Sequence, residues 1–83
     1  NLGNVEFAFV TGDYARGIDS GLIDLVVVGD IDKNYLNLLV EKSEALIKRR
    51  IRTLVLSKEE YAQRNKLFQS EDVLIVWNKE GPV

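Results

Sequence analysis

The chain has 83 residues, of which 46% are hydrophobic and 29% are charged, and its formal net charge is −2. These values are typical of one globular domain, and the acidic balance argues against a DNA-binding module, which usually carries a basic surface. The absence of Cys and His excludes disulfides, thiolate metal sites and a histidine general base. No apolar run approaches the roughly 18 residues of a membrane span, so we expect a cytoplasmic protein.

Two strands separated by a turn-rich segment are predicted in the first third of the chain. Val5–Thr11 is dense in β-branched and aromatic residues, and Gly12 is expected to end it. Residues 13–21 contain several turn signals around what can be one helical turn. Leu22–Val28 is an almost continuous apolar run, which indicates a strand covered on both faces, and Gly29 is expected to end this strand.

A long helix is predicted next, from about Lys33 to Lys48. Asp30 or Asp32 can cap its first turn, because a short side-chain oxygen satisfies free backbone amides there. Cations at residues 48–50 suit the negative end of the helix dipole. Six residues at helical spacing are expected to form one buried stripe: Leu36, Leu39, Val40, Ser43, Leu46 and Ile47.

The last third of the chain predicts a strand, a short helix and a strand. Ile51–Leu56 is the third predicted strand, and Ser57 with Glu60 fits a capping box that opens a helix through about Phe68. Val73–Trp77 is the fourth predicted strand. The element order predicts an α/β domain, α+β in some schemes, with a mixed sheet of about four strands flanked by two main helices. The second and third strands should be parallel, whereas the first two are joined by too little chain for a crossover helix.

Residues 9–30, FVTGDYARGIDSGLIDLVVVGD, carry the most specific pattern. The runs that matter are Gly12-Asp13-Tyr14-Ala15-Arg16-Gly17 and Gly21-Leu22-Ile23-Asp24-Leu25. They resemble the DNA polymerase β-like nucleotidyltransferase superfamily, especially its minimal single-domain members. Those proteins have a strand, Gly-Ser, a helical turn that ends in Ala-Arg-Gly, and then Ser-Asp-h-Asp-Leu, where h is apolar, on the next strand.

The resemblance implies a two-metal phosphoryl-transfer site. Side chains two apart on a strand share a face, so Asp-h-Asp places two carboxylates side by side, and a third comes from the neighbouring strand. In the family these groups hold two divalent metals about 4 Å apart, which bind the attacking and leaving oxygens. The Gly-Ser turn binds the triphosphate through backbone amides and a hydroxyl.

This chain departs from the family pattern at three points. Asp13 stands in place of the Ser, and Leu22 stands in place of the first Asp of the pair, which leaves Asp24 alone. The third carboxylate should fall near Arg50 or Arg52, and both are cationic. We therefore predict no catalytic residue, no metal and no cofactor, but a vestigial nucleotide-site motif made of Gly12, Asp13, Arg16, Gly17, Asp24, Arg50 and Arg52.

The replacements suggest what the site has become. Asp24 belongs to an otherwise apolar strand, so we expect its side chain to be partly buried, where an unpaired carboxylate is costly. If the second and third strands are adjacent, Arg50 or Arg52 lies beside Asp24. The sequence thus predicts an ion pair between Asp24 and one of these arginines, in the place of a metal. Arg16 either touches an anion or lies on the surface, and residues 48–52 are either a phosphate-binding patch or a solvated helix end.

The leading functional expectation is a degenerate, non-catalytic nucleotidyltransferase-like domain that serves as a regulatory or assembly module. The chain contains no Met, and we expect a single domain, residues 1–83, excised from a longer protein. Family members of this type occur behind winged-helix domains in prokaryotic transcriptional regulators, so DNA contacts would lie outside this chain. A protein partner or a homo-oligomer is expected, and no membrane.

Two alternatives remain open. One is an active enzyme that transfers a nucleotidyl group from a Mg²⁺-bound NTP to a protein or small molecule, with Asp24 and a carboxylate from Asp13, Asp19 or Asp30. The other is a partner-binding subunit, like the antitoxins of minimal nucleotidyltransferase pairs.

Overall fold

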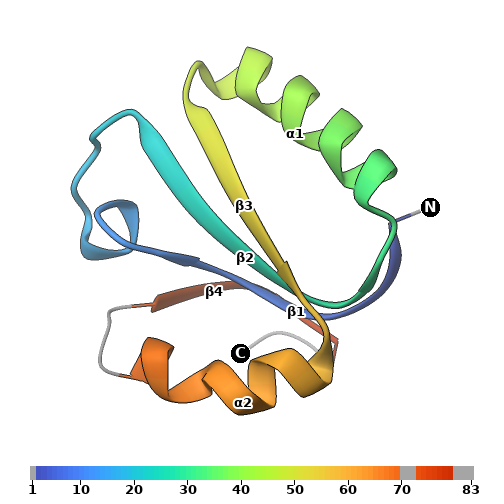
Figure 1. Ribbon diagram of the computed structural model, residues 1–83. Coiled ribbons are helices and arrows are strands. Elements are labelled where there is room, and N and C mark those ends of the chain that lie inside the picture. Colours follow the sequence, from blue (N-terminus) through green and yellow to red (C-terminus); the bar gives the residue numbers. More distant parts are fainter. Residues whose placement is uncertain (1, 70–72, 80–83) are drawn as a thin grey trace.

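The protein is a four-stranded mixed sheet with one helix on each face, an α+β fold, as the sequence predicts (Figure 1). The structure is a computed structural model that describes residues 2–69 and 73–79. The strands are β1 (Gly3–Thr11), β2 (Leu22–Ile31), β3 (Arg50–Leu56) and β4 (Val73–Asn78), in the spatial order β3-β2-β1-β4. β1 runs antiparallel to both β2 and β4, whereas β2 and β3 are parallel.

The connections between the strands set where the helices lie. A 3₁₀ turn, η1 (Tyr14–Arg16), lies between β1 and β2, and α1 (Lys33–Ile47) joins β2 to β3. α2 (Lys58–Gln69) then connects β3 at one edge of the sheet to β4 at the other. α1 and α2 lie on opposite faces (Figure 1). None of the described helices is long and apolar enough to cross a membrane.

The central strand β2 contributes to both core layers, because successive side chains of a strand point to opposite faces. On the α2 side, Val26 and Val28 are buried with Phe9. On the α1 side, Val27 is buried with Leu36 of α1. The apolar run that predicted a strand covered on both faces is confirmed.

Four aromatic side chains hold α2 against the sheet. Phe7 meets Tyr61 in a T-shaped contact with ring centroids 4.8 Å apart, and Phe9 meets Phe68 in another at 5.3 Å. Such edge-to-face pairs add about 0.5–1.5 kcal/mol each to the burial of the rings. We call Phe7, Phe9, Tyr61 and Phe68 the aromatic cluster.

Both predicted helix caps are present. The Oδ1 atom of Asp32 accepts hydrogen bonds from the backbone N–H groups of Asn34 and Tyr35, so Asp32 and not Asp30 caps α1. At α2 the Ser57 Oγ accepts from the Glu60 N–H, and a Glu60 carboxylate oxygen accepts from the Ser57 N–H at 2.8 Å. This backbone hydrogen bond is the main reason that the pKa of Glu60 lies below its ordinary value.

The predicted buried stripe of α1 is wrong in part. Leu36 is buried, and Val40 and Ser43 are half-buried, but Leu39 and Ile47 are exposed and Leu46 is 82% exposed. The side chain that turns inward is Glu44, whose Oε2 accepts a hydrogen bond of 2.7 Å from the backbone N–H of Ile51 in β3. This hydrogen bond links the end of α1 to β3, while Leu39 and Leu46 stay on the exposed flank of the helix.

Gly29 does not end β2, which continues to Ile31. It lies opposite a bulge of β1 at Glu6, since Val5 pairs with Gly29 and Phe7 pairs with Val28. Its φ is +148°, and a Cβ atom at this position would lie 2.2 Å from the carbonyl oxygen of Asn4. Only glycine permits both this backbone conformation and this close approach.

We expect Gly29→Ala to destabilise the domain by about 3 kcal/mol or more, because β1 and β2 would have to separate at the bulge. The matched control is Gly21→Ala. Gly21 also has a positive φ, of +83°, but a Cβ atom at this position would have no neighbour within 4 Å, so that change should cost only about 1–2 kcal/mol. Chemical denaturation of the two variants measures the difference. Equal costs would contradict the role given to Gly29.

Candidate functional site

The predicted site residues converge where three neighbouring strands meet. Asp24 of β2 is in register with Thr11 of β1 on one side and with Arg52 of β3 on the other. Asp24 lies on the α2 side of the sheet, because it is two and four residues from Val26 and Val28 of that layer. Gly12 follows Thr11 directly, so its turn borders the same carboxylate.

Asp24 and Arg52 form the expected ion pair. The Nε of Arg52 donates a hydrogen bond of 2.6 Å to the Oδ1 of Asp24. The Asp24 side chain is 26% exposed and that of Arg52 is 69% exposed, so the carboxylate is the half-buried partner. This hydrogen bond to Asp24 raises the pKa of the Arg52 guanidinium above its ordinary value.

Gly12 leaves room for the Asp24 carboxylate because it has no side chain. Its φ is +76°, and a Cβ atom at this position would lie 3.1 Å from the Oδ2 of Asp24. A side chain at position 12 would therefore press on the carboxylate as well as strain the turn. Gly12, Asp24 and Arg52 form one unit, in which the carboxylate lies between a glycine turn and a guanidinium.

Leu22 and Arg50 occupy the next pair of positions on the same face. They are in register with each other, as Asp24 and Arg52 are. Both border a shallow depression of about 530 Å³ that also contains Glu44 and Arg52 in its lining. Within residues 2–69 and 73–79, the side chain of Arg50 makes no ion pair, so it is a free cation beside an apolar side chain.

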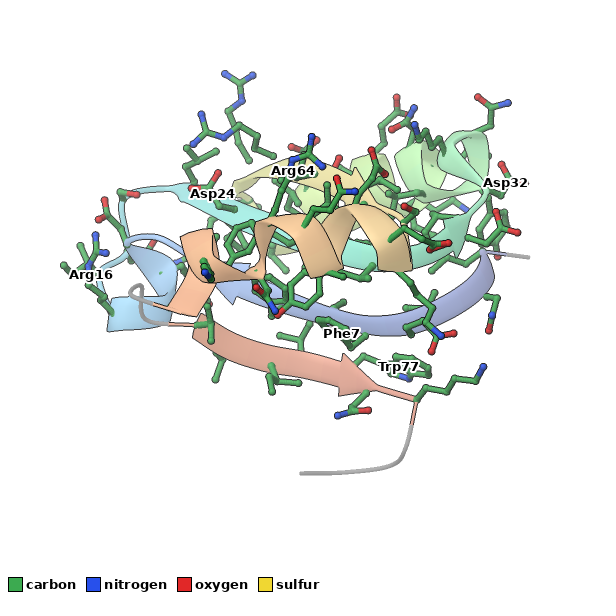
Figure 2. The ribbon with its side chains drawn as sticks, turned by 60° about the horizontal axis from the view of Figure 1, so that its bottom comes forward. Phe7, Arg16, Asp24, Asp32, Arg64 and Trp77 are labelled. Carbon is green, nitrogen blue, oxygen red and sulfur yellow. The ribbon has the colours of Figure 1, made fainter. Side chains whose placement is uncertain are left out.

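The other predicted site residues lie apart from this unit. Arg16 forms an ion pair with Asp13, three residues earlier, and both side chains are about half exposed. Arg16 points outward at the end of the molecule, away from Asp24 (Figure 2). Gly17 ends η1 with a φ of +81°, and its N–H donates to the carbonyl of Tyr14. Of the two interpretations of Arg16, the surface position is the one observed.

A third ion pair at the same end of the sheet, between Arg49 and Asp19, was not predicted from the sequence. Arg49, between α1 and β3, donates from its Nε to both carboxylate oxygens of Asp19, at 3.0 and 2.9 Å, and its Nη2 also contacts Oδ2. The Arg50 N–H donates to the carbonyl of Gly21 nearby. These contacts tie the loop before β2 to the turn before β3. A signal was present, because parallel strands begin at the same edge of a sheet, which brings the two turns together.

The donor set does not fit a two-metal centre. Hard divalent cations bind clustered carboxylate oxygens, and such a centre needs several of them. In the described part of the chain, no three acidic or other metal-ligating side chains gather at one place. Asp24 is instead paired with the Arg52 guanidinium, and Leu22 and Arg50 form the next register pair on the same face.

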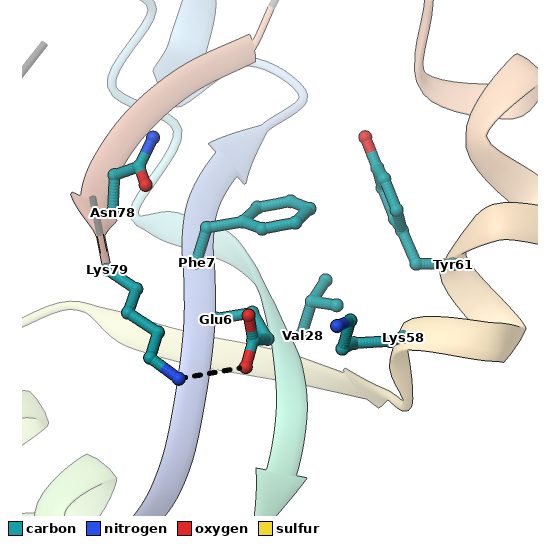
Figure 3. A pocket seen from close by; sticks show the side chains of 7 residues that line it. All are labelled: Glu6, Phe7, Val28, Lys58, Tyr61, Asn78 and Lys79. Atoms are coloured by element: carbon teal, nitrogen blue, oxygen red, sulfur yellow. Dashed lines mark hydrogen bonds and ion pairs between the residues drawn. The ribbon is translucent and has the colours of Figure 1, made fainter.

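Two further cavities lie on the α2 side. One, of about 440 Å³, lies at the opposite end of β2, by Val28; Phe7, Tyr61 and Lys58 border it, and Lys79 bonds to Glu6 at its rim (Figure 3). The other, of about 240 Å³, lies between the aromatic cluster and the β4 residues Val73 and Ile75. Neither contains Asp24 or an arginine of the predicted site in its lining.

No family model, no curated protein and no solved structure matches this chain. The nucleotidyltransferase resemblance therefore rests on the sequence pattern of residues 9–30.

The Asp19–Arg49 pair predicts a defined pH dependence. Hydrogen bonds from Arg49, and then from the Gly21 N–H, hold the pKa of Asp19 below its ordinary value of 3.8. The stability that ionised Asp19 contributes is therefore fully present above about pH 3.8 and is lost as the pH falls through the lowered, folded-state pKa.

Arg49→Ala should raise the pKa of Asp19 toward 3.8, as measured by an NMR titration of its carboxyl carbon. Arg64→Ala, which removes an arginine from α2, is the control and should leave that pKa in place. An unchanged Asp19 titration in Arg49→Ala would remove the electrostatic role assigned to this pair.

Proposed function

We propose that this domain is a non-catalytic, nucleotidyltransferase-like module that serves regulation or assembly. The observation that carries the proposal is the Asp24–Arg52 ion pair, with an Nε to Oδ1 distance of 2.6 Å. In a two-metal site, a divalent cation would occupy the space beside this carboxylate. Here a guanidinium that the chain itself supplies, from Arg52, lies beside the carboxylate.

The neighbouring register pair supports the same conclusion. Leu22 takes the position of the first motif carboxylate and offers no ligand, while Arg50 lies beside it on β3. A metal ion at this point would meet two cations and one carboxylate that is already neutralised. Electrostatic repulsion would oppose its binding.

The alternative of an active enzyme lacks a second carboxylate at the site. Asp13 is engaged with Arg16 and Asp19 with Arg49. Asp30 is in register with Asn4 near the other end of β2, six residues from Asp24. Each local carboxylate that the enzyme hypothesis requires is either paired elsewhere or distant along the strand.

A regulatory role agrees with the chemistry of the surface. The net charge of −2 gives this domain no overall electrostatic attraction for nucleic acid, so a DNA contact would belong to another domain, as in winged-helix regulators of the resembling family. An antitoxin-like subunit is a special case of the same proposal, in which the partner is a second protein. Both uses need an exposed surface for protein contacts and no catalytic centre.

Calorimetric titration with ATP and GTP, with and without Mg²⁺ or Mn²⁺, tests the proposal. We expect that the metal ions will not strengthen binding of either nucleotide. Metal-dependent nucleotide binding by the unaltered chain would overturn the non-catalytic interpretation and favour the enzyme.

A reconstruction experiment asks whether the ion pair is what replaced the metal. Leu22→Asp combined with Arg52→Asp places three carboxylates on one face of two adjacent strands, and we expect Mn²⁺ affinity to rise by at least about tenfold. The matched control, Leu22→Asn with Arg52→Asn, alters the same positions without adding carboxylates. Circular dichroism checks that both variants fold. Equal Mn²⁺ affinity in the two variants would contradict the inferred geometry of the site.

A further inference from the structure

Four cations gather where α1 ends and β3 begins. The chain has eleven Lys and Arg residues, and four of them lie within five consecutive positions: Lys48, Arg49, Arg50 and Arg52. The end of α1 and the starts of β2 and β3 lie together at one end of the molecule (Figure 1), since parallel strands begin at the same edge of a sheet. We call these four residues the basic corner.

The basic corner keeps a positive charge after its ion pairs are counted. The carboxylates of Asp19 and Asp24 neutralise two of its arginines. In the described part of the chain, Lys48 and Arg50 take part in no ion pair, and both residues are exposed. Glu44 also borders them, so four cations face three carboxylates. The basic corner is therefore a positive area on a chain whose net charge is −2.

Two shallow depressions join at Arg50. One, of about 530 Å³, is bordered by Arg50 and Arg52, and the other, of about 460 Å³, is bordered by Arg50, Lys48 and Arg49. Gly21 lines both of them, so the two depressions form one continuous surface. Pockets for small molecules bury most of the ligand, whereas this surface is open along its length. It suits an extended segment of polypeptide that lies across it.

Apolar side chains are accessible beside these cations. Leu22, which is half-buried, lines the larger depression, and the exposed Ala45 of α1 lines the smaller one. Leu46, the next residue of α1, is 82% exposed, which is the highest value among the large hydrophobic residues of the described chain. Arginine and apolar side chains together are typical of surfaces through which proteins contact one another.

We propose that the basic corner binds an acidic segment of a partner protein. Carboxylates of this segment bind the Lys48 ammonium and the Arg50 guanidinium, whose planar fork matches a carboxylate through two parallel hydrogen bonds. Apolar side chains of the segment contact Leu22 and Ala45 between these charges. Arginine clusters are a recurrent means by which proteins recognise acidic motifs.

The distribution of charge favours a short acidic segment over other anions. A nucleic acid is a long polyanion, and outside the basic corner this chain has more acidic than basic residues, which repel it. A free phosphate ion meets no enclosed cavity here, and both unpaired cations are exposed to solvent. A segment with a few carboxylates and apolar residues matches the extent of the surface and both of its chemical properties.

This inference rests on the proposed role in regulation or assembly, since it gives the chemistry of the partner. The two can nevertheless fail separately. Metal-dependent nucleotide binding would overturn the non-catalytic interpretation, whereas failure to bind an acidic peptide would overturn the docking surface alone.

Fluorescence anisotropy with a labelled synthetic peptide is the first test. The probe is a peptide of about twelve residues that contains Glu, Asp and a few Leu, and its control has Gln and Asn in place of the acids. We expect a dissociation constant on the order of 10 μM at low salt, which rises as added salt screens the exposed charges. Equal binding of the neutral peptide, or tighter binding of inorganic phosphate or single-stranded RNA than of the acidic peptide, would overturn the proposal.

Variants that remove charge locate the binding surface. Lys48→Gln combined with Arg50→Gln should raise the dissociation constant of the acidic peptide by at least about fivefold, because both unpaired cations are lost. The matched control, Lys33→Gln with Lys66→Gln, removes the same total charge from exposed positions of α1 and α2 that line neither depression. Equal weakening in the two double variants would contradict the proposal, since net charge alone would then account for binding.

NMR spectra of the unaltered, ¹⁵N-labelled chain give a second readout that needs no substitution. The acidic peptide should shift the backbone amide resonances of Gly21 and of residues 48–52, which border the two depressions. Shifts centred on α2 or β4 would place the peptide on another surface and overturn the assignment.

Discussion

The fold depends on the burial of β2 from both sides. Val26 and Val28 pack beneath α2, while Val27 packs beneath α1, so one strand anchors the two helices on opposite faces of the sheet. β2 also pairs with both β1 and β3, so three of the four strands meet along it. A domain of this size buries only about 60% of the surface that its unfolded chain exposes. Much of its stability must therefore come from this strand and the aromatic cluster.

The position of the site at one end of β2 brings two ion pairs together there. The parallel strands β2 and β3 begin at the same edge, and their starts bring Asp24 to Arg52 and Asp19 to Arg49. Both pairs are wholly or partly exposed, so each contributes less to stability than a buried hydrophobic contact does. Their effect is geometric, because they fix the loop before β2 and fill the space beside the Asp24 carboxylate.

The elements, the mixed character of the sheet and the parallel pairing of β2 with β3 were predictable because they depend on local patterns, whereas the position of β4 beside β1 was not predicted. Alternation, helix caps and connection lengths are features of short stretches of sequence. An ion pair between Asp24 and an arginine is predicted as soon as β2 and β3 are parallel neighbours. The errors have non-local causes. The inward turn of Glu44 depends on the backbone of Ile51, and Gly29 continues β2 because β1 bulges opposite it. The Asp19–Arg49 pair joins residues thirty positions apart. These contacts have no periodic signal in the sequence, although the common starting edge of β2 and β3 brings the two turns with Asp19 and Arg49 together.

The uneven packing of α1 determines which end of this helix opens first. Leu36 and Val40 hold the first half of the helix on the sheet, whereas the last turn exposes Leu46 and is held by polar contacts, from Glu44 to the Ile51 N–H and from Arg49 to the Ile47 carbonyl. Local opening occurs where few apolar contacts must be broken. Amide protons near the C-terminal end of α1 will therefore exchange with solvent before those of its first half. The helix therefore opens first at the end that carries the basic residues, up to the point where Arg49 is tied to Asp19.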